Sequence, residues 1–266
     1  MSYTIEELKI IVTLAFLLYT SILDIKYREV DWKVWLVFGI ISSILTFLEI
    51  MIYGFVITDL VRLVISVVMA LGIGGLAYYL DLFGGADFFA LVVLAVMHPW
   101  NPLKPLFKLK IELPFILTIL VNSLIMSLIV PLTNVIRNLM NYKAISKLSI
   151  PMKYKIAYMF LGFPTTIGKY VKMKFSYPLT VYEISSTGRI KVKCRLTFSI
   201  EEEHYEHQEK LKRLVKKGLL RYNDIVWVTQ GIPLLVFITL GYIVSLVFGD
   251  FILCFLFTYV LKVPAC

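Results

Sequence analysis

Residues 113–136, LPFILTILVNSLIMSLIVPLTNVI, carry no charged side chain. They are long enough to cross a membrane, because a spanning helix needs about 20 mostly apolar residues. The stretch LVISVVMALGIGGLAYYL at residues 63–80 has the same character. Hydrophobic residues make up 59% of the 266-residue chain and charged residues only 17%. Soluble domains are about 45–50% apolar, so the sequence predicts a polytopic α-helical membrane protein.

Further apolar stretches bring the expected number of transmembrane helices to six. These are residues 4–23, 34–53, 88–100 and 231–261. The third of them is short, and Asp250 interrupts the last. Lys9 in the first stretch is expected to reach the membrane surface with its long side chain. Apolar stretches recur almost to the C-terminus, which is not the pattern of a secreted protein with one signal peptide.

A basic segment separates the fifth apolar stretch from the sixth. Between Arg137 and Asp224 there are 18 Lys and Arg against 7 Asp and Glu, a net charge of +11, while the whole chain carries +9. The regular elements expected here are a β-hairpin of residues 179–185 and 190–198 around Ser186-Thr187-Gly188, a helix at 201–217 ended by Gly218, and a strand at 225–228. The uncharged residues 156–168 are too short to span and are expected in a core or at a membrane interface.

These patterns predict a small soluble α+β domain inserted between helices five and six. Its expected bounds are 143–228, with membrane regions at 1–142 and 229–266. Lysine and arginine of short loops favour the cytoplasm. The loop after the first helix and the inserted domain are both basic and share one side, which we assign to the cytoplasm. Both termini are then expected outside, as is the lysine-rich loop between helices four and five.

Two aspartates are expected at the cytoplasmic face. Asp24 ends the first helix and Asp87 begins the fourth, so an even number of crossings lies between them. The same count places Glu49, Asp59 and Asp250 toward the outer face. An acidic side chain at the margin of a membrane span is costly and indicates a functional site. Two carboxyl groups that meet share a proton, so one can activate water while the other polarises a carbonyl.

Each aspartate also has a simpler interpretation. Asp87 is placed to cap a helix, and Asp24 has basic neighbours that favour a solvated interface charge. Gly84 and Gly85 precede Asp87 and would permit close approach by a substrate backbone or by the first helix. A proton- or cation-coupled transporter that uses both aspartates remains an alternative, as does a membrane scaffold whose basic domain docks a partner. Transporters often show internal repeats, and none is evident in this sequence.

Two short motifs resemble those of a known family. Gly84-Gly85-Ala86-Asp87 resembles the G-x-G-D motif of membrane aspartyl proteases, with alanine in place of the second glycine. The segment Asp24-Ile-Lys-Tyr-Arg-Glu-Val-Asp-Trp resembles the region of the first aspartate in the type IV prepilin peptidase group. Six helices with a soluble domain before the last are most similar to the archaeal branch, the preflagellin (prearchaellin) peptidases.

The resemblance implies an aspartyl endopeptidase that removes a short basic leader from filament-subunit precursors at the cytoplasmic face. Asp24 and Asp87 would be the catalytic pair, and Gly84, Gly85 and Ala86 would allow close approach. No cofactor and no metal are implied. Other type IV pilin-like precursors are a second possible substrate class. The cysteine-rich N-terminal loop of the methylating bacterial enzymes is missing, so no methyltransferase activity is implied.

The partners expected for the basic domain are anionic lipid headgroups, toward which each surface Lys or Arg contributes about 1 kcal/mol. A basic leader would need an acidic patch instead. The candidate patch is Glu201, Glu202, Glu203, Glu206 and Glu209. No nucleic-acid partner is expected, because the segment has no recognisable base-reading motif and is tethered to the membrane at both ends.

The remaining polar residues are expected to be structural. His204 and His207 have no third spaced ligand, which argues against a metal site. Cys194, Cys254 and Cys266 form no CxxC pair, so no disulfide framework is expected. Asp81 is expected to end the third helix at the interface. Asp59 and Arg62, three residues apart on one helix, are expected to pair.

Overall fold

The computed structural model describes residues 2–54, 56–110, 112–141, 150–184, 190–199, 202–263 and 266. The chain divides into two compact units, each treated by itself below. Met1–Ser127 and Pro233–Cys266 form the first, which we call the helical unit. Leu128–Ile232 form the second, which we call the inserted unit because it lies between two parts of the first in sequence.

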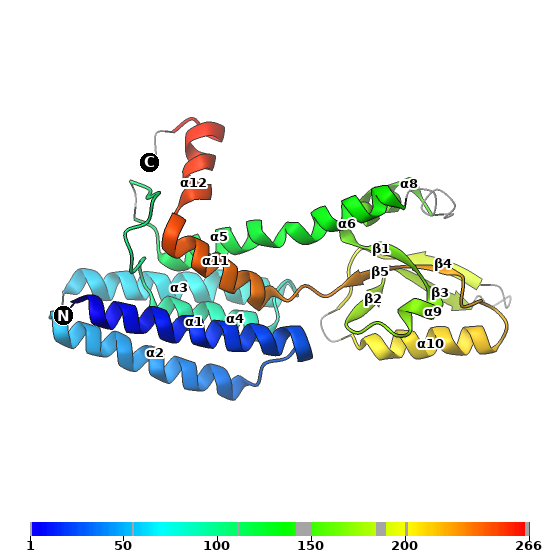
Figure 1. Ribbon diagram of the computed structural model, residues 1–266, viewed down its shortest axis with the longest axis horizontal. Coiled ribbons are helices and arrows are strands. Elements are labelled where there is room, and N and C mark those ends of the chain that lie inside the picture. Colours follow the sequence, from blue (N-terminus) through cyan, green and yellow to red (C-terminus); the bar gives the residue numbers. More distant parts are fainter. Residues whose placement is uncertain are drawn as a thin grey trace. The chain divides into compact units, whose positions relative to one another are not determined.

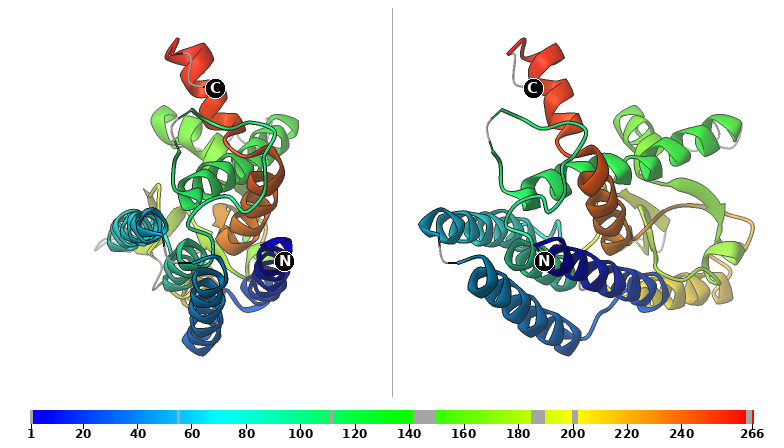
Figure 2. Two further views of the ribbon diagram at one scale, coloured as in Figure 1. Left: turned by 90° about the vertical axis from the view of Figure 1, so that its left-hand side faces the viewer. Right: turned by 60° about the vertical axis from the view of Figure 1, so that its left-hand side comes forward.

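The helical unit is a bundle with a short central helix. Its elements are α1 (Ser2–Tyr27), α2 (Trp32–Tyr53), α3 (Ile57–Tyr79), α4 (Gly85–Met97), α5 (Phe115–Ser127), α11 (Leu234–Phe248), α12 (Phe251–Phe255) and the π-helical turn η1 (Leu256–Val260). The helices α1 to α4 run side by side (Figures 1 and 2). α4 packs against both α2 and α3, and α11 packs against both α1 and α5. Because α4 is apolar on all sides, it is stable only when other helices surround it.

Within the described residues, four apolar helical stretches are long enough to cross a membrane. They are Ile5–Tyr27, Trp32–Tyr53, Ile57–Tyr79 and Phe115–Met140. α4 and α11 are also apolar but shorter. The fourth stretch is divided near Leu128 into α5 and α6, and the predicted sixth helix is divided at Gly249, whose φ is +62°. Six crossings therefore remain a prediction.

Asp250 holds the break between α11 and α12. Its backbone N–H donates to Phe107 O at 3.0 Å. Its carboxylate accepts a hydrogen bond from Leu109 N–H at 3.1 Å and another from the Thr118 hydroxyl at 2.6 Å. Asp250 therefore joins the loop before α5, α5 itself and the start of α12, and these contacts give it a structural role.

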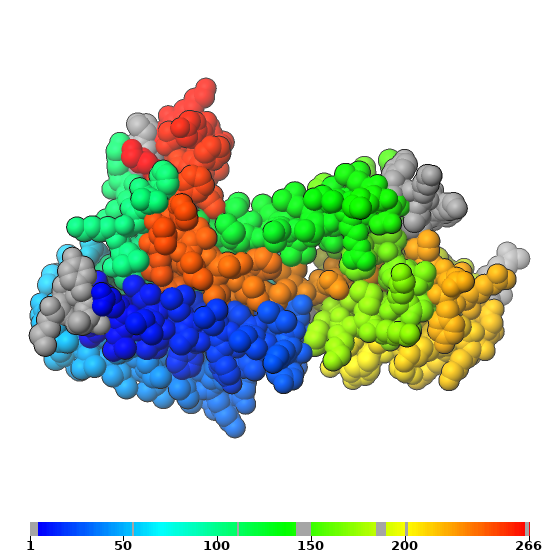
Figure 3. Space-filling view, viewed as in Figure 1, coloured from blue at the N-terminus to red at the C-terminus, as the bar shows by residue number. Residues whose placement is uncertain are grey.

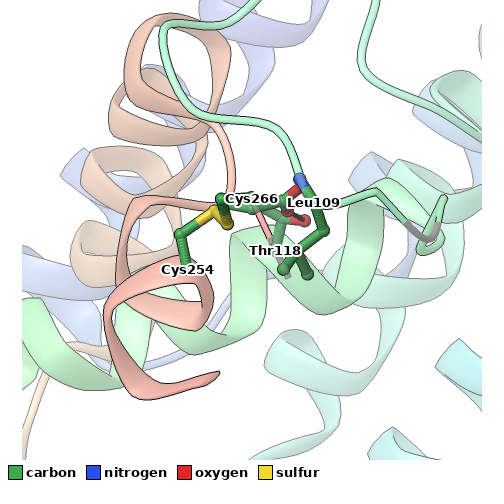
Figure 4. Close-up of a disulfide and its surroundings, with 5 residues drawn as sticks. Leu109, Thr118, Cys254 and Cys266 are labelled. Atoms are coloured by element: carbon green, nitrogen blue, oxygen red, sulfur yellow. Dashed lines mark hydrogen bonds between the residues drawn. A yellow bond between two sulfur atoms is a disulfide. The ribbon is translucent and has the colours of Figure 1, made fainter. Parts of the chain in front are cut away.

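A disulfide joins Cys254 of α12 to Cys266, with 5.7 Å between the Cα atoms (Figure 4). The sequence predicts no disulfide framework, and the pairing of these two cysteines corrects that prediction. The chain enters the left-handed region at Lys262, where φ is +55°, after η1 has ended. The last residue thus returns to α12. The spacing of the two cysteines follows no motif, so the pairing depends on this change of direction.

A buried ion pair connects α1 to α2. The Lys9 ammonium lies 2.7 Å from a carboxylate oxygen of Glu49, and the two side chains are 3% and 9% exposed. The expectation that Lys9 extends to the membrane surface is wrong, because Glu49 provides a partner inside the bundle. A second polar cluster surrounds His98, whose Nε2 lies 3.0 Å from both the Thr13 and the Tyr242 hydroxyls. Charged and polar groups inside a bundle require such partners.

Gly241 allows α11 to approach α5 closely. A Cβ atom built on Gly241 would lie only 2.6 Å from the backbone nitrogen of Ser123. We expect Gly241→Ala to lower the stability by about 1–3 kcal/mol, because the backbone of α5 would have to move. Thermal unfolding of the purified protein in detergent measures this change. Gly72→Ala is the control, since nothing lies within 4 Å of its Cβ. Equal melting temperatures for both variants would contradict the close approach.

The inserted unit is an α+β domain, as the sequence predicted. Its elements are α6 (Ile129–Met140), α8 (Met152–Leu161), β1 (Phe163–Thr166), α9 (Ile167–Tyr170), β2 (Ser176–Pro178), β3 (Thr180–Ile184), β4 (Ile190–Cys194), α10 (His204–Lys216) and β5 (Ile225–Gln230). β5 lies between β1 and β2 in an antiparallel sheet, while β3 and β4 pair separately. The predicted hairpin, helix and last strand are confirmed. Glu201 and the turn Ser186-Thr187-Gly188 lie outside the described residues.

The central strand β5 packs against two groups of side chains. Val226 and Val228 belong to one core with Leu211 and Leu214 of α10. Trp227, between them in sequence, belongs to a second core with Tyr158 of α8. This alternation follows from the pleat of a strand, whose successive side chains point to opposite faces. Residues 156–168, predicted to lie in a core or at an interface, are divided between α8, β1 and the start of α9.

Candidate active site

Asp24 lies in the last turns of α1, where α1 meets the beginning of α11. Its Oδ2 accepts a hydrogen bond from the backbone N–H of Leu235 at 3.3 Å. One turn earlier, the Ser21 hydroxyl donates to Leu235 O at 3.2 Å and lies 2.8 Å from the Thr239 hydroxyl. The N-terminus of α11 carries partial positive charge, which favours a carboxylate at this place. Sequence distance hides this contact, since residues 24 and 235 belong to opposite ends of the chain.

Asp87 lies in the first turn of α4. Its Oδ2 accepts a hydrogen bond from the Gly84 N–H at 3.0 Å, so it satisfies one of the amides left open at the helix N-terminus. The capping role considered from the sequence is therefore present. The cap uses only Oδ2, so Oδ1 of Asp87 remains for a second function. Asp24 and Asp87 thus each contact the N-terminal end of a helix, α11 for one and α4 for the other.

The two aspartates are brought within electrostatic reach of one another. The charge of Asp24 acts on Asp87, and the charge of Arg28 acts on both. Arg28 follows Asp24 by four residues, a spacing that places two side chains on the same side of a helix. Its N–H donates to Asp24 O at 3.0 Å, and its φ of +59° ends α1. From the sequence, Arg28 is only one of the basic neighbours that favour a solvated charge at Asp24, although its four-residue spacing was the available signal for a closer role.

The glycines before Asp87 have open space beside them. A Cβ atom on Gly84 would meet nothing nearer than Asp87 Oδ2 at 3.4 Å, and one on Gly85 would meet only Tyr78 at 4.0 Å. Close packing against α1, one of the two reasons considered for these glycines, is therefore not seen. Ala86 is partly buried and packs on the core of the bundle. A side chain the size of alanine would therefore fit at Gly84 and at Gly85.

The other acidic candidates lie apart from this pair. Asp81 is exposed just after α3 and has φ +55°. Asp59 pairs with Arg62 at 3.6 Å, as expected from their spacing, and Arg62 also binds Glu112 at 2.5 Å. The contacts of Asp59 and Glu112 with Arg62 are structural and lie outside the Asp24–Asp87 pair.

The two histidines of the inserted unit have different surroundings. His204 lies against the rings of Phe175 and Tyr177. His207 contacts the carboxylate of Glu202, which also binds Arg195 Nη1 at 2.6 Å. Burial alone would raise the pKa of Glu202, but its hydrogen bonds with Arg195 and His207 hold this pKa below its ordinary value. Glu202 of the proposed acidic patch is thus already engaged in an ion pair.

Comparison with known proteins finds two family models that match parts of the chain. The model of the type IV leader peptidase family matches residues 11–132, a range that contains both aspartates and the motif before Asp87. A second model, the archaeal peptidase A24 C-terminus type II, matches residues 154–251. Together the two models cover most of both units.

Two relatives extend the comparison along nearly the whole chain. The preflagellin peptidase of Methanococcus maripaludis is 22% identical over 90% of this chain and 94% of its own length. The preflagellin peptidase of Methanococcus voltae is 26% identical over 89% of this chain and 93% of its own length. The matched peptidase models and relatives support a protease, and the long apolar helices indicate a membrane protein.

Proposed function

We propose that this chain is an aspartyl endopeptidase that removes a short basic leader from preflagellin-like precursors. The proposal rests on one observation above all: within one helical bundle, Asp24 accepts a hydrogen bond at the N-terminal end of α11 and Asp87 accepts one at the N-terminal end of α4. Their position inside the matched family region supports it. The substrate class follows from the preflagellin peptidases to which the chain is similar.

In the proposed reaction the two carboxyl groups hold one proton between them. The ionised carboxylate takes a proton from water, and the water oxygen attacks the carbonyl carbon of the scissile peptide bond. The protonated carboxyl donates to the carbonyl oxygen. When the tetrahedral intermediate collapses, the C–N bond breaks, the amine leaves with the proton held by the pair, and one hydroxyl proton of the intermediate returns to the pair. The positive charge of Arg28 balances the single negative charge of the pair.

Substrate access in this proposal uses the open side of the Asp87 motif. Gly84 and Gly85 leave room for an extended backbone, and Ala86 is the smallest residue that can replace the family glycine without adding a large side chain. The hydrolysis needs no cofactor and no metal. The transporter alternative finds no support in the family match, which names a peptidase.

We place residues 1–142 and 229–266 in the membrane with six crossings, and the soluble domain, 143–228, in the cytoplasm with the active site. Both termini then lie outside. The Cys254–Cys266 disulfide supports this orientation, because it follows α11 and disulfides persist in oxidising compartments. A basic leader kept in the cytoplasm agrees with the same sidedness rule.

A cleavage assay tests the proposal. The purified chain in detergent should cut a precursor that carries a basic leader before an apolar helix, and mass spectrometry of the product identifies the bond. A precursor whose leader lysines and arginines are replaced by serine is the control and should be cut more slowly. A pilin-like precursor tested in parallel defines the substrate range. Chelators should leave the rate unchanged, and an absolute requirement for added metal would contradict the mechanism.

A further inference from the structure

The helices α6 and α8 of the inserted unit pack against each other through polar groups. The Asn138 side chain is fully buried, and its amide donates to Gly162 O at 2.7 Å and to Met159 O at 3.1 Å. Asn134 donates to Phe160 O at 3.0 Å. These carbonyls belong to the last turn of α8 and its cap, and they would otherwise lack hydrogen-bond donors. α6 therefore turns its amide side chains toward the protein.

The apolar side chains of both helices face the other way. On α6 and α8 the large apolar residues with 51–82% of their surface exposed are Ile129, Leu132, Ile136, Leu139, Met140, Met152, Ile156 and Phe160. Their spacing of three or four residues places them in one stripe on each helix. We call the two stripes together the α6–α8 face. In the space-filling view, α6 (green) forms part of the visible surface of the inserted unit (Figure 3).

This arrangement is the reverse of a helix on a water-soluble domain, whose apolar side faces the core and whose polar side faces water. Single exposed apolar side chains are ordinary, but a contiguous apolar face marks a binding surface. The charged residues near this face are basic. Lys153 and Lys155 lie on α8, and the guanidinium of Arg137 on α6 stacks on the Phe163 ring at 3.6 Å. Such residues suit anionic headgroups.

The connection of the chain shows what covers this face. α6 continues the apolar stretch Phe115–Met140, which is long enough to cross a membrane. α6 is therefore the last part of the stretch placed in the membrane, and α8 packs on α6. The bilayer is thus already beside α6, and it lies next to α8 before any partner protein is needed.

We propose that the α6–α8 face lies in the lipid bilayer: α6 ends the spanning stretch, and the outward side chains of α8 enter the boundary between headgroups and acyl chains and hold the inserted unit on the membrane surface. Interfacial helices enter this boundary by about 5–10 Å, enough to cover the outward side chains of α8. This role is independent of peptide hydrolysis. In this proposal the unit contacts lipid mainly through apolar side chains. Its net positive charge is not the main contact, because the lysines only border the apolar face.

Spin labelling of the full chain tests the proposal. The free Cys194 is replaced by serine, and single cysteines are introduced at Ile136, Ile156 or Phe160 and labelled with a nitroxide. Labels at these exposed positions leave the core unchanged. The control position is Tyr205 on α10, which is 54% exposed and outside the α6–α8 face. Each protein is placed, one chain per disc, in nanodiscs of phosphatidylcholine and phosphatidylglycerol.

Collision rates with oxygen, which partitions into lipid, and with a water-soluble nickel chelate locate each label. We expect the oxygen-to-nickel ratio to be several-fold higher at the three positions of the α6–α8 face than at position 205. Equal ratios at all four positions would show that the face is in water and would overturn the proposal. Low access to both reagents would show that protein covers the face and would equally overturn the proposal. The labels report position and not catalysis, so the outcome does not depend on the proposed peptidase mechanism.

Discussion

Asp24→Asn and Asp87→Asn should each lower the rate of leader cleavage by about a thousandfold or more, the scale of loss found when one member of a catalytic set is removed. Asparagine keeps an oxygen that can accept the N–H of Leu235 or of Gly84, so each side chain keeps the partner seen in the structure. Only the ionisable group is lost. Single-turnover cleavage of a basic-leader precursor in detergent measures the effect on the chemical step.

Asp81→Asn is the matched control for these two variants. Asp81 lies six residues before Asp87 but is exposed, and asparagine tolerates its left-handed φ of +55°. We expect this variant to cut at nearly the unmodified rate. Thermal unfolding of all three variants separates loss of chemistry from loss of fold. A correctly folded variant at position 24 or 87 that cuts at the unmodified rate would remove that residue from the catalytic pair.

Lys9→Met should have the largest effect on stability, about 3–5 kcal/mol, because it leaves the Glu49 carboxylate buried without its partner. The side chains have similar length, so little volume changes and the loss comes from the unpaired charge. Thermal unfolding in detergent, compared with the unmodified chain, gives the change. The double variant Lys9→Met with Glu49→Leu should recover most of this stability, since apolar residues often replace a buried ion pair without cost.

An exposed ion pair of the same unit supplies the control. Lys108 binds Glu112 at 3.0 Å, but both side chains are more than half exposed. Lys108→Met should change the stability by about 0–1 kcal/mol, as is usual for solvated pairs. If Lys9→Met is no more harmful than Lys108→Met, the Lys9–Glu49 pair does not hold α1 to α2 in the way that the structure indicates.

The long helices could be predicted because hydropathy alone defines them. Residues 63–80 and 113–136 carry no charge, so their helical character needs no information from the rest of the chain. Hydropathy does not show where such a stretch divides. Gly249 ends α11 because its φ is positive and the loop at Phe107 binds the next residue, and neither property is visible in a mean hydropathy. The expected surface position of Lys9 is wrong for the same reason. Its partner Glu49 lies on another helix, and hydropathy does not show that contact.

The candidate site could be predicted only in part. Counting the crossings between Asp24 and Asp87 needs no tertiary structure, which is why the sequence could propose that they meet. Their surroundings depend on contacts between distant residues. The N–H of Leu235 lies 211 residues beyond Asp24, and no local pattern connects them. Arg28 is different, because its spacing from Asp24 is local and its role could have been inferred from a helical wheel.

The hydrogen bond from Leu235 to Asp24 has a consequence for the order in which the protein is made. Translation delivers both aspartates early, but the amide that holds the first of them emerges only after the whole inserted unit. A ribosome paused before residue 235 therefore carries an unfinished site in an otherwise largely assembled bundle. The site is therefore complete only when α11 has been made. We expect chains that end before residue 235 to lack peptidase activity.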